Sequence, residues 1–207
     1  MSDASAGSLH VIVLAAGASR RFGSPKQLVR FNGRPLMHTV ISRAVEVAGH
    51  AVTVVLGANA AELAPLLRHS PASIVINRNW QEGMASSLRV GVKSLSGTCE
   101  AAMILLADQP SVTTEDLRRL VGAWRRQADG IAAAQFGTTV GAPAIFPRWC
   151  FEELAQLQGD RGARDFLRRH RDRVQRLPMP SAAIDIDTPE DLLSLDVQPA
   201  AAPRDAS

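Results

Sequence analysis

Two arginines, a lysine and two glycines follow the first apolar run of the chain. Residues 9–26 read LHVIVLAAGASRRFGSPK, in which a run typical of a buried strand gives way to small residues. Small side chains let backbone N–H groups approach a ligand, and Arg20, Arg21 and Lys26 can neutralise a polyanion such as a triphosphate. The segment therefore predicts a phosphate-binding loop, although an ordinary strand-to-helix turn with solvated arginines fits it equally well.

Two well-known phosphate-binding motifs do not fit this segment. A P-loop has four residues before its Gly-Lys-Ser/Thr triplet, whereas five separate Gly17 from Gly23, and serine follows Gly23. The dinucleotide fingerprint G-x-G-x-x-G fails at its second glycine, where Ser19 stands. The segment instead matches L-x-x-G-x-x-x-R-x-G-x-x-K on residues 14–26.

One carboxylate follows a second apolar run. Asp108 comes directly after the run 101–107, and Pro110 then turns the chain away. A lone aspartate at a strand end is often a turn or cap residue, but here Thr113 can cap the next helix. The pattern favours metal ligation, because Mg²⁺ on a triphosphate needs few protein carboxylates.

A second acidic pair lies near the end of the chain. Asp185 and Asp187 are two residues apart and would share one face of an extended segment. They are either metal ligands or surface residues, with Asp187 or Thr188 as the cap of a last helix that begins near Pro189. Together with the cationic loop, they favour Asp187 as a second magnesium ligand and Asp185 as its rival.

Two glycine-containing segments supply the remaining candidates. Residues 83–87, GMASS, place hydroxyl and N–H groups at a helix start, which is either an anion site or a serine-capped helix. Residues 159–164, GDRGAR, either bind a second substrate or form a tight turn between helices. The residues themselves leave both alternatives open.

The elements that must position these residues alternate between strands and helices. Strands are expected at 9–14, 51–56, 73–76, 101–107, 130–135 and 174–177, and helices at 36–48, 59–67, 84–95, 113–124, 148–157, after 164 and from 189. Residues 136–146 fit either strands or a loop. The alternation predicts an α/β fold in which helices cover both faces of a mostly parallel, Rossmann-like sheet.

Ligand sites in such sheets lie beyond the carboxyl ends of the strands. The glycine, arginine and lysine loop, Asn77 and Asp108 follow the first, third and fourth expected strands. We therefore expect these residues to converge at one edge of the sheet.

Composition sets limits on the class of protein. The 207 residues suit one domain, expected at 9–197, with disordered segments at 1–8 and 198–207. Two distant cysteines and five histidines show no metal-ligand spacing, and neither a signal peptide nor a membrane span is evident, which favours the cytoplasm. A net charge of +3 with 4% aromatic residues suits a small polyanion and argues against nucleic acid or membrane partners.

Taken together, the segments resemble the molybdenum cofactor cytidylyltransferase group of the MobA-like nucleotidyltransferase family. The resemblance covers nearly the whole chain in order, and two positions depart from the commonest pattern: Phe22 stands where methionine is usual, and Ala142 where many relatives have histidine. The second departure bears on the acceptor side. The matching segments are 14–28, 77–89, 108–110, 141–146, 159–164 and 185–192.

The resemblance implies a nucleotide-diphospho-sugar transferase-like fold and a role for each matching residue. Catalysis falls to Arg21, Lys26 and Asp108, with Mg²⁺ on Asp108 and on Asp187 or Asp185. The sequence Leu-Ala-Ala-Gly resembles that of cytidine users, and the methyl group of Ala16 would narrow the space for a base. The implied nucleotide-binding residues are Leu14, Ala15, Ala16, Gly17, Arg21, Lys26, Asn77, Gly83, Ser86 and Ser87, and the implied acceptor-binding residues are Gly141, Pro143, Asp160 and Arg164.

The activity implied by the resemblance is transfer of CMP from CTP to the terminal phosphate of molybdopterin, with release of pyrophosphate. A transient contact with a molybdoenzyme or its chaperone would follow from that role. The rivals are transfer to a sugar or alditol phosphate, and a non-catalytic accessory protein that binds or inserts the molybdenum cofactor. A nicotinamide-dependent oxidoreductase is disfavoured by the missing G-x-G-x-x-G.

Overall fold

A computed structural model describes residues 8–19, 22, 25–31, 33–159, 162–188 and 190–191. The segments expected to be disordered lie outside these ranges, apart from Ser8, and so do Arg21 and Asp160. Of the last expected helix, only residues 190 and 191 are described.

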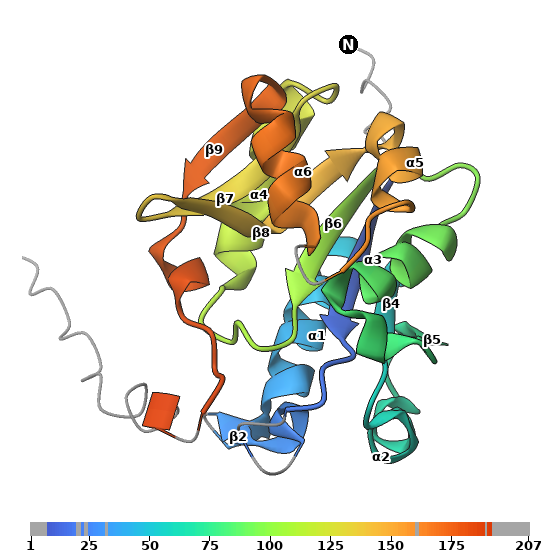
Figure 1. The fold of residues 1–207 in the computed structure, drawn as a ribbon. Coiled ribbons are helices and arrows are strands. Elements are labelled where there is room, and N and C mark those ends of the chain that lie inside the picture. The colour runs from blue at the N-terminus through green and yellow to red at the C-terminus, as the bar shows by residue number, and fades with distance from the viewer. Residues whose placement is uncertain are drawn as a thin grey trace, which may run out of the picture.

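In the described part of the chain, a seven-stranded sheet forms the middle layer, in the order β5-β4-β1-β6-β8-β7-β9 (Figure 1). The first four of these strands are mutually parallel, and β9 is parallel to β7. The mostly parallel α/β fold expected from the sequence is confirmed. The strands are β1 (Leu9–Ala15), β4 (Val52–Leu56), β5 (Ser73–Ile76), β6 (Ala101–Leu106), β7 (Ile131–Phe136), β8 (Thr139–Pro147) and β9 (Val174–Pro178).

Strand β8 runs against its neighbours and fills the segment that the sequence left open. It is antiparallel to both β6 and β7. Only two residues separate β7 from β8, and a connection this short joins strands as a hairpin, which is antiparallel. Gly137 supplies the positive φ of 55° that such a turn requires.

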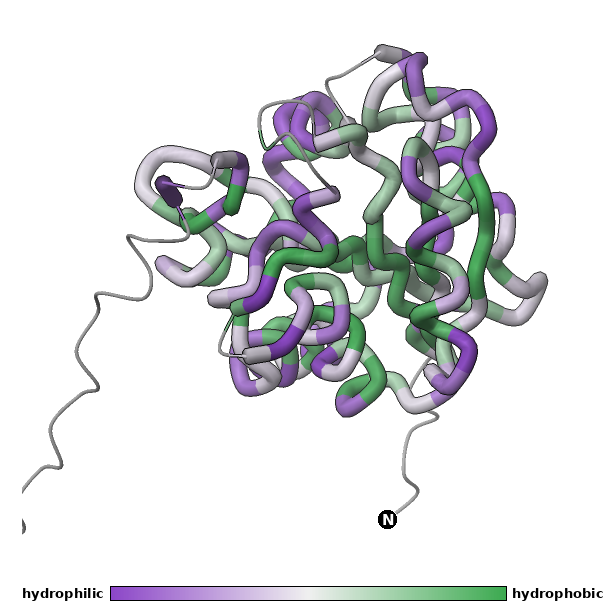
Figure 2. Tube along the Cα trace, turned by 90° about the horizontal axis from the view of Figure 1, so that it is seen from below, coloured by the Kyte–Doolittle hydropathy of each residue, from purple (hydrophilic) through white to green (hydrophobic). Residues whose placement is uncertain are grey.

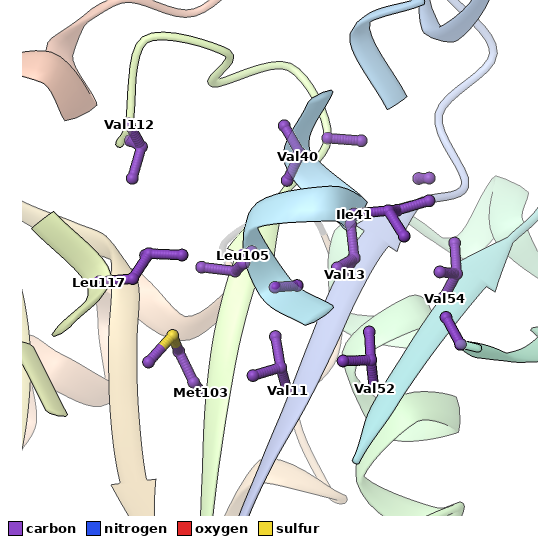
Figure 3. Packing of buried hydrophobic residues seen from close by; sticks show 14 of the residues in the cluster. Val11, Val13, Val40, Ile41, Val52, Val54, Met103, Leu105, Val112 and Leu117 are labelled. Atoms are coloured by element: carbon purple, nitrogen blue, oxygen red, sulfur yellow. The ribbon is translucent and has the colours of Figure 1, made fainter. Parts of the chain in front are cut away.

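Helices cover both faces of the sheet. Helices α1 (Leu36–Ala48) and α4 (Thr114–Arg126) pack on one face, and α3 (Met84–Lys93), α5 (Phe151–Leu154) and α6 (Gly162–Arg169) pack on the other. Successive side chains of a strand point to opposite faces, so Val11 and Val13 pack on the α1 face (Figure 3). Ile12 and Leu14 pack on the α3 face.

The hydrophobic stretches run through the middle of the molecule and most hydrophilic residues lie at its periphery (Figure 2). None of the described helices is long and apolar enough to cross a membrane.

Two expected helices are shorter than their patterns suggested. The segment 59–67 forms α2 (Ala60–Leu63) and then a 3₁₀ turn (Ala64–Leu67), because Pro65 has no N–H to continue an α-helix. The segment 148–157 forms a 3₁₀ turn (Arg148–Cys150) and then α5. A small hairpin of β2 (Arg30–Phe31) and β3 (Arg34–Pro35) before α1 had no sequence prediction.

Candidate functional site

A pocket of about 590 Å³ lies at the carboxyl ends of β1 and β6. These two strands end side by side, because their register pairs Leu14 with Leu106. The convergence predicted from the strand-end rule is therefore observed for the first loop and Asp108. The lining comes from residues 14–19, Lys26, Gln27, Trp80, Gln81, Gly83, Met84, Ser87, residues 106–108 and Asp187.

Lys26 is the charged centre of this pocket. Its Nζ donates to Oδ2 of Asp108 and to Oδ1 of Asp187, each at 2.8 Å. Burial alone would lower the pKa of Lys26, but the charges and hydrogen bonds of Asp108 and Asp187 outweigh it and hold that pKa above its usual value. The lysine is therefore a cation shared between two carboxylates that are 79 residues apart in sequence.

Backbone contacts explain why these three residues meet. Lys26 begins a 3₁₀ turn (Lys26–Leu28) below the first loop, and Asp108 follows the end of β6. The N–H of Ile186 donates to the carbonyl oxygen of Asp108 at 2.9 Å, which places Asp187 beside it. Arg43 of α1 donates to the carbonyl oxygens of Pro110 and Val112 and so fixes the turn after Asp108.

Two buried carboxylate oxygens in this region have no hydrogen-bond partner among the described residues, Oδ1 of Asp108 and Oδ1 of Asp185. Burial raises the pKa of Asp185, and the charges of Asp108 and Asp187 raise it further. Asp187, not Asp185, shares the ammonium group of Lys26 with Asp108. No described group of three or more His, Cys, Asp or Glu residues forms a metal site, so a cation here would need ligands from a substrate or from water.

Asn77 lies behind the pocket wall. Its side chain is 1% exposed, and its Nδ2 donates to Oγ of Ser86 at 2.7 Å and to Oγ of Ser87 at 3.0 Å. Of the predicted residues in this region, Gly83 and Ser87 line the pocket, whereas Asn77 and Ser86 do not. Asn77 and Ser86 thus hold the start of α3 in place.

The start of α3 has fewer free donors than the sequence suggested. The N–H of Ala85 donates to Gly159 at 3.1 Å, and the N–H of Ser86 donates to Gly83 at 3.1 Å. No serine side chain caps the helix, whose N-cap residue is Gly83. The hydrogen bond from Ala85 instead holds Gly159 against the start of α3.

The three predicted acceptor residues that the structure describes, Gly141, Pro143 and Arg164, do not line the pocket. Gly141 and Pro143 are buried in β8, and Pro143 borders a separate small cavity near α1. Arg164 is exposed on α6, close enough to Asp185 for its charge to favour the carboxylate. Arg164 therefore lies near Gly141 of β8 and on that side of Asp185 and Asp187, the two candidates for the second metal ligand.

Several residues that line the pocket received no role from the sequence, and three of them have long or aromatic side chains, Gln27, Trp80 and Gln81. All three stand inside or beside segments that carry the family resemblance, next to residues that did receive a role. Gln27 directly follows Lys26 and is 3% exposed, and a long amide beside a motif lysine is the signal that could have identified it.

Comparisons with known proteins identify the family of this chain. The model of the MobA-like NTP transferase domain matches residues 11–174. The chain is 30% identical over 195 residues to the nicotine blue oxidoreductase of Paenarthrobacter nicotinovorans, with 89% of this chain and 94% of that protein covered. It is also 30% identical over 193 residues to the purine catabolism protein PucB of Bacillus subtilis, with 87% and 92% covered.

A solved structure shows the same architecture. Rv0371c of Mycobacterium tuberculosis superposes with a TM-score of 0.80 at 28% identity and covers 92% of this chain and 98% of its own. A manganese complex of the same protein superposes with a TM-score of 0.76 at 26% identity, with 91% and 97% covered. The match includes every pocket-lining residue except Asp187 and most of the sheet, and the chain belongs to the MobA-like NTP transferase family.

Proposed function

We propose that this nucleotidyltransferase transfers CMP from CTP to the terminal phosphate of molybdopterin and releases pyrophosphate. The observation that carries the proposal is the position of Lys26 between Asp108 and Asp187, at the mouth of the loop formed by residues 14–19. A triphosphate needs cations on its leaving group and a divalent ion between its phosphates, and this site offers both a lysine and two carboxylates.

The residues present fit a divalent cation. Oδ1 of Asp108 is buried without a hydrogen-bond partner among the described residues, and a hard cation would satisfy this oxygen. Asp108 and Asp187 would hold Mg²⁺, which when bound neutralises charge on the phosphates. The manganese complex of Rv0371c supports a divalent ion in this family fold.

The chain contributes binding and charge more than covalent chemistry. A phosphate oxygen of the acceptor attacks the α-phosphorus of CTP in line; a new P–O bond forms, and the α–β bond breaks. Lys26, released from the carboxylates, is placed to neutralise the departing pyrophosphate. Arg21, which lies outside the described residues, is assigned to the phosphates by its place in the loop motif.

A small base fits the wall that the first loop forms. Ala16 is 6% exposed, and a Cβ built on Gly57 would lie 2.5 Å from the carbonyl oxygen of Ala16 and 2.8 Å from Cβ of Trp80. The loop, Gly57 and Trp80 are thus packed closely behind the pocket wall. The methyl group of Ala16, which lines the pocket, narrows the space for a base, and this supports the smaller pyrimidine of CTP.

The acceptor is assigned by the resemblance of residues 141–146 and 159–164 to the molybdenum cofactor group. Arg164 is the described candidate best placed to meet a phosphate, because it is exposed near Asp185. Gly141 and Pro143 would shape this side without touching the pocket, and the role of Asp160 rests on its motif alone.

The deciding experiment measures pyrophosphate release with Mg²⁺ and molybdopterin while CTP, GTP and ATP are compared. We expect release with CTP well above that with the purine nucleotides. A GTP preference would refute the cytidine assignment, and turnover with sugar or alditol phosphates in place of molybdopterin would refute the acceptor. Absence of release with every nucleotide would favour the accessory-protein role.

An oxidoreductase is the competing function, because a relative that is 30% identical is named as one. The first loop has no second glycine where a dinucleotide would need it, since Ser19 stands there. A fluorescence titration with NADH and NADPH separates the two functions. Saturable binding of either, together with no pyrophosphate release, would favour the oxidoreductase.

A further inference from the structure

The side chain of Gln27 reaches back under the loop that follows β1. Its Nε2 donates to the carbonyl oxygens of Ala15 at 3.2 Å and Gly17 at 3.0 Å, and its Oε1 accepts from Oγ of Ser19 at 3.2 Å. Carbonyl oxygens only accept, so these partners fix which end of the amide faces the loop. Gln27 is 3% exposed, and both Nε2 and Oε1 of its amide form hydrogen bonds.

We propose that Gln27 determines which base the pocket accepts. Its hydrogen bonds hold carbonyl oxygens of the loop away from the pocket, so that N–H groups of the loop point toward the ligand. The inference rests on the proposed function, from which it takes CTP as the ligand. Gln27 is a positioning residue in this account, because it acts through the backbone of the loop and does not touch the base.

Peptide geometry links the amide of Gln27 to the pocket. In a trans peptide, the C=O of one residue and the N–H of the next point in opposite directions. Because the carbonyls of Ala15 and Gly17 face Gln27, the N–H groups of Ala16 and Ala18 face away from it. No described residue accepts a hydrogen bond from either N–H, and both residues line the pocket.

The other carbonyls of this loop are also engaged. The carbonyl oxygen of Leu14 accepts from the N–H of Ala107 at 3.1 Å, and that of Ala16 accepts from the N–H of Ala58 at 3.1 Å. All four carbonyls of residues 14–17 therefore already have a donor from the protein. The loop therefore presents N–H donors, those of Ala16 and Ala18, to a ligand.

A surface of N–H donors can distinguish cytosine from uracil, which are equal in size. Cytosine has two adjacent acceptors on its pairing edge, the ring nitrogen N3 and the carbonyl O2. Uracil has an N–H at N3. This donor would face the N–H donors of the loop, and both would be left without an acceptor. The geometry thus selects cytosine over uracil, which ring size alone cannot do.

Two substitutions test this role. Gln27→Met keeps the length and fills the space without a donor, and Gln27→Glu keeps the shape but offers only acceptors at neutral pH. Binding of CTP and UTP to the full chain is measured by calorimetry with Mg²⁺ and without acceptor. We expect the preference of the wild-type chain for CTP over UTP to fall by about tenfold in each variant, the worth of one hydrogen bond.

The matched control is Thr53→Val. Thr53 is also 3% exposed, and this substitution removes a part-buried side-chain hydrogen bond with Nε2 of His10 at 2.9 Å, at the opposite end of β1. The melting temperature should fall, although by less than in Gln27→Met, which removes three hydrogen bonds, whereas the preference for CTP over UTP should stay unchanged.

The outcomes are distinguishable. Equal losses of CTP and UTP affinity in the Gln27 variants, or no loss, would overturn the inference and leave the proposed function standing. A wild-type chain that binds neither nucleotide would overturn both. A wild-type chain that binds CTP and yet transfers nothing to molybdopterin would overturn only the acceptor, and a lost CTP preference in the variants would still support the role of Gln27.

Discussion

The two sides of the pocket edge are built differently. On the β1 side, the N–H groups of Ala16 and Ala18 have no acceptor among the described residues and belong to the pocket lining, and Lys26 lies between two carboxylates. On the β8 side, Gly141 and Pro143 are buried inside a strand, and only Arg164 among the described acceptor candidates is exposed.

The difference follows from strand direction. Parallel β1 and β6 end together, so their following loops are free of ladder hydrogen bonds and can turn toward a ligand. Strand β8 is antiparallel to both neighbours, and its backbone groups around Gly141 are used in pairing with β7. On the proposed nucleotide side the backbone of the loop is therefore free to meet a ligand, whereas on the proposed acceptor side the backbone of β8 is used in the sheet, which leaves side chains such as Arg164.

The largest effect is expected at Asp108, where the two sides meet. Asp108→Asn keeps the shape but removes the charge that pairs with Lys26, and with it one proposed cation ligand. We expect turnover to fall by about a hundredfold to a thousandfold, measured as pyrophosphate release, with an unchanged circular dichroism spectrum. Asp172→Asn is the control, because Asp172 is exposed before β9; near wild-type rate in Asp108→Asn would show that the site lies elsewhere.

The sequence predicted that the first loop and Asp108 lie together, because the ends of parallel strands meet at one edge of a sheet. The spacing of the first loop and the carboxylate after residue 107 were sufficient to place Lys26 and Asp108 in one site. Gln27 and Trp80 escaped prediction because their contacts depend on how turns fold back. The direction of β8 escaped because Gly- and Thr-rich residues 136–146 carry no clear period, and the roles of Arg21 and Asp160 stay predictions because both lie outside the described residues.

Lys26→Met should separate two roles of the nucleotide side. Turnover should fall by about a hundredfold, since the cation for the leaving phosphates is lost. Without nucleotide, the same variant should bind Mn²⁺ more tightly by about 1 kcal/mol, or roughly fivefold, because Asp108 and Asp187 no longer share an ammonium group. Calorimetry measures the second effect, and weaker Mn²⁺ binding in the variant would contradict the shared-cation geometry.

Gly57→Ala tests how tightly the β1 side is packed. The added Cβ would meet the carbonyl oxygen and Cβ of Ala16 at 2.5 and 2.7 Å, atoms that cannot move without shifting the loop. We expect a loss of about 1–3 kcal/mol in the free energy of unfolding and a raised KM for CTP. Urea denaturation and steady-state kinetics measure the two effects.

The control for Gly57→Ala makes the same change where there is room. A Cβ on Gly122 in α4 would lie 3.8 Å from Nη1 of Arg126, so Gly122→Ala should stabilise the chain by up to about 1 kcal/mol. If Gly57→Ala were as harmless as Gly122→Ala, the loop would be looser than the close approach of Ala16 indicates.

The smallest effect is expected at Gly141, on the β8 side. A Cβ there would lie 3.7 Å from Nε of Arg164 and 3.7 Å from the ring of Phe136, which are ordinary contacts. Gly141→Ala should therefore change the free energy of unfolding by less than about 0.5 kcal/mol and leave the KM for CTP unchanged. Because the contact with Arg164 is ordinary, that side chain keeps its position and the KM for the acceptor should stay unchanged as well. A rise in the KM for CTP instead would mean that the nucleotide reaches across β6, and the two sides of the edge would then form one continuous binding surface.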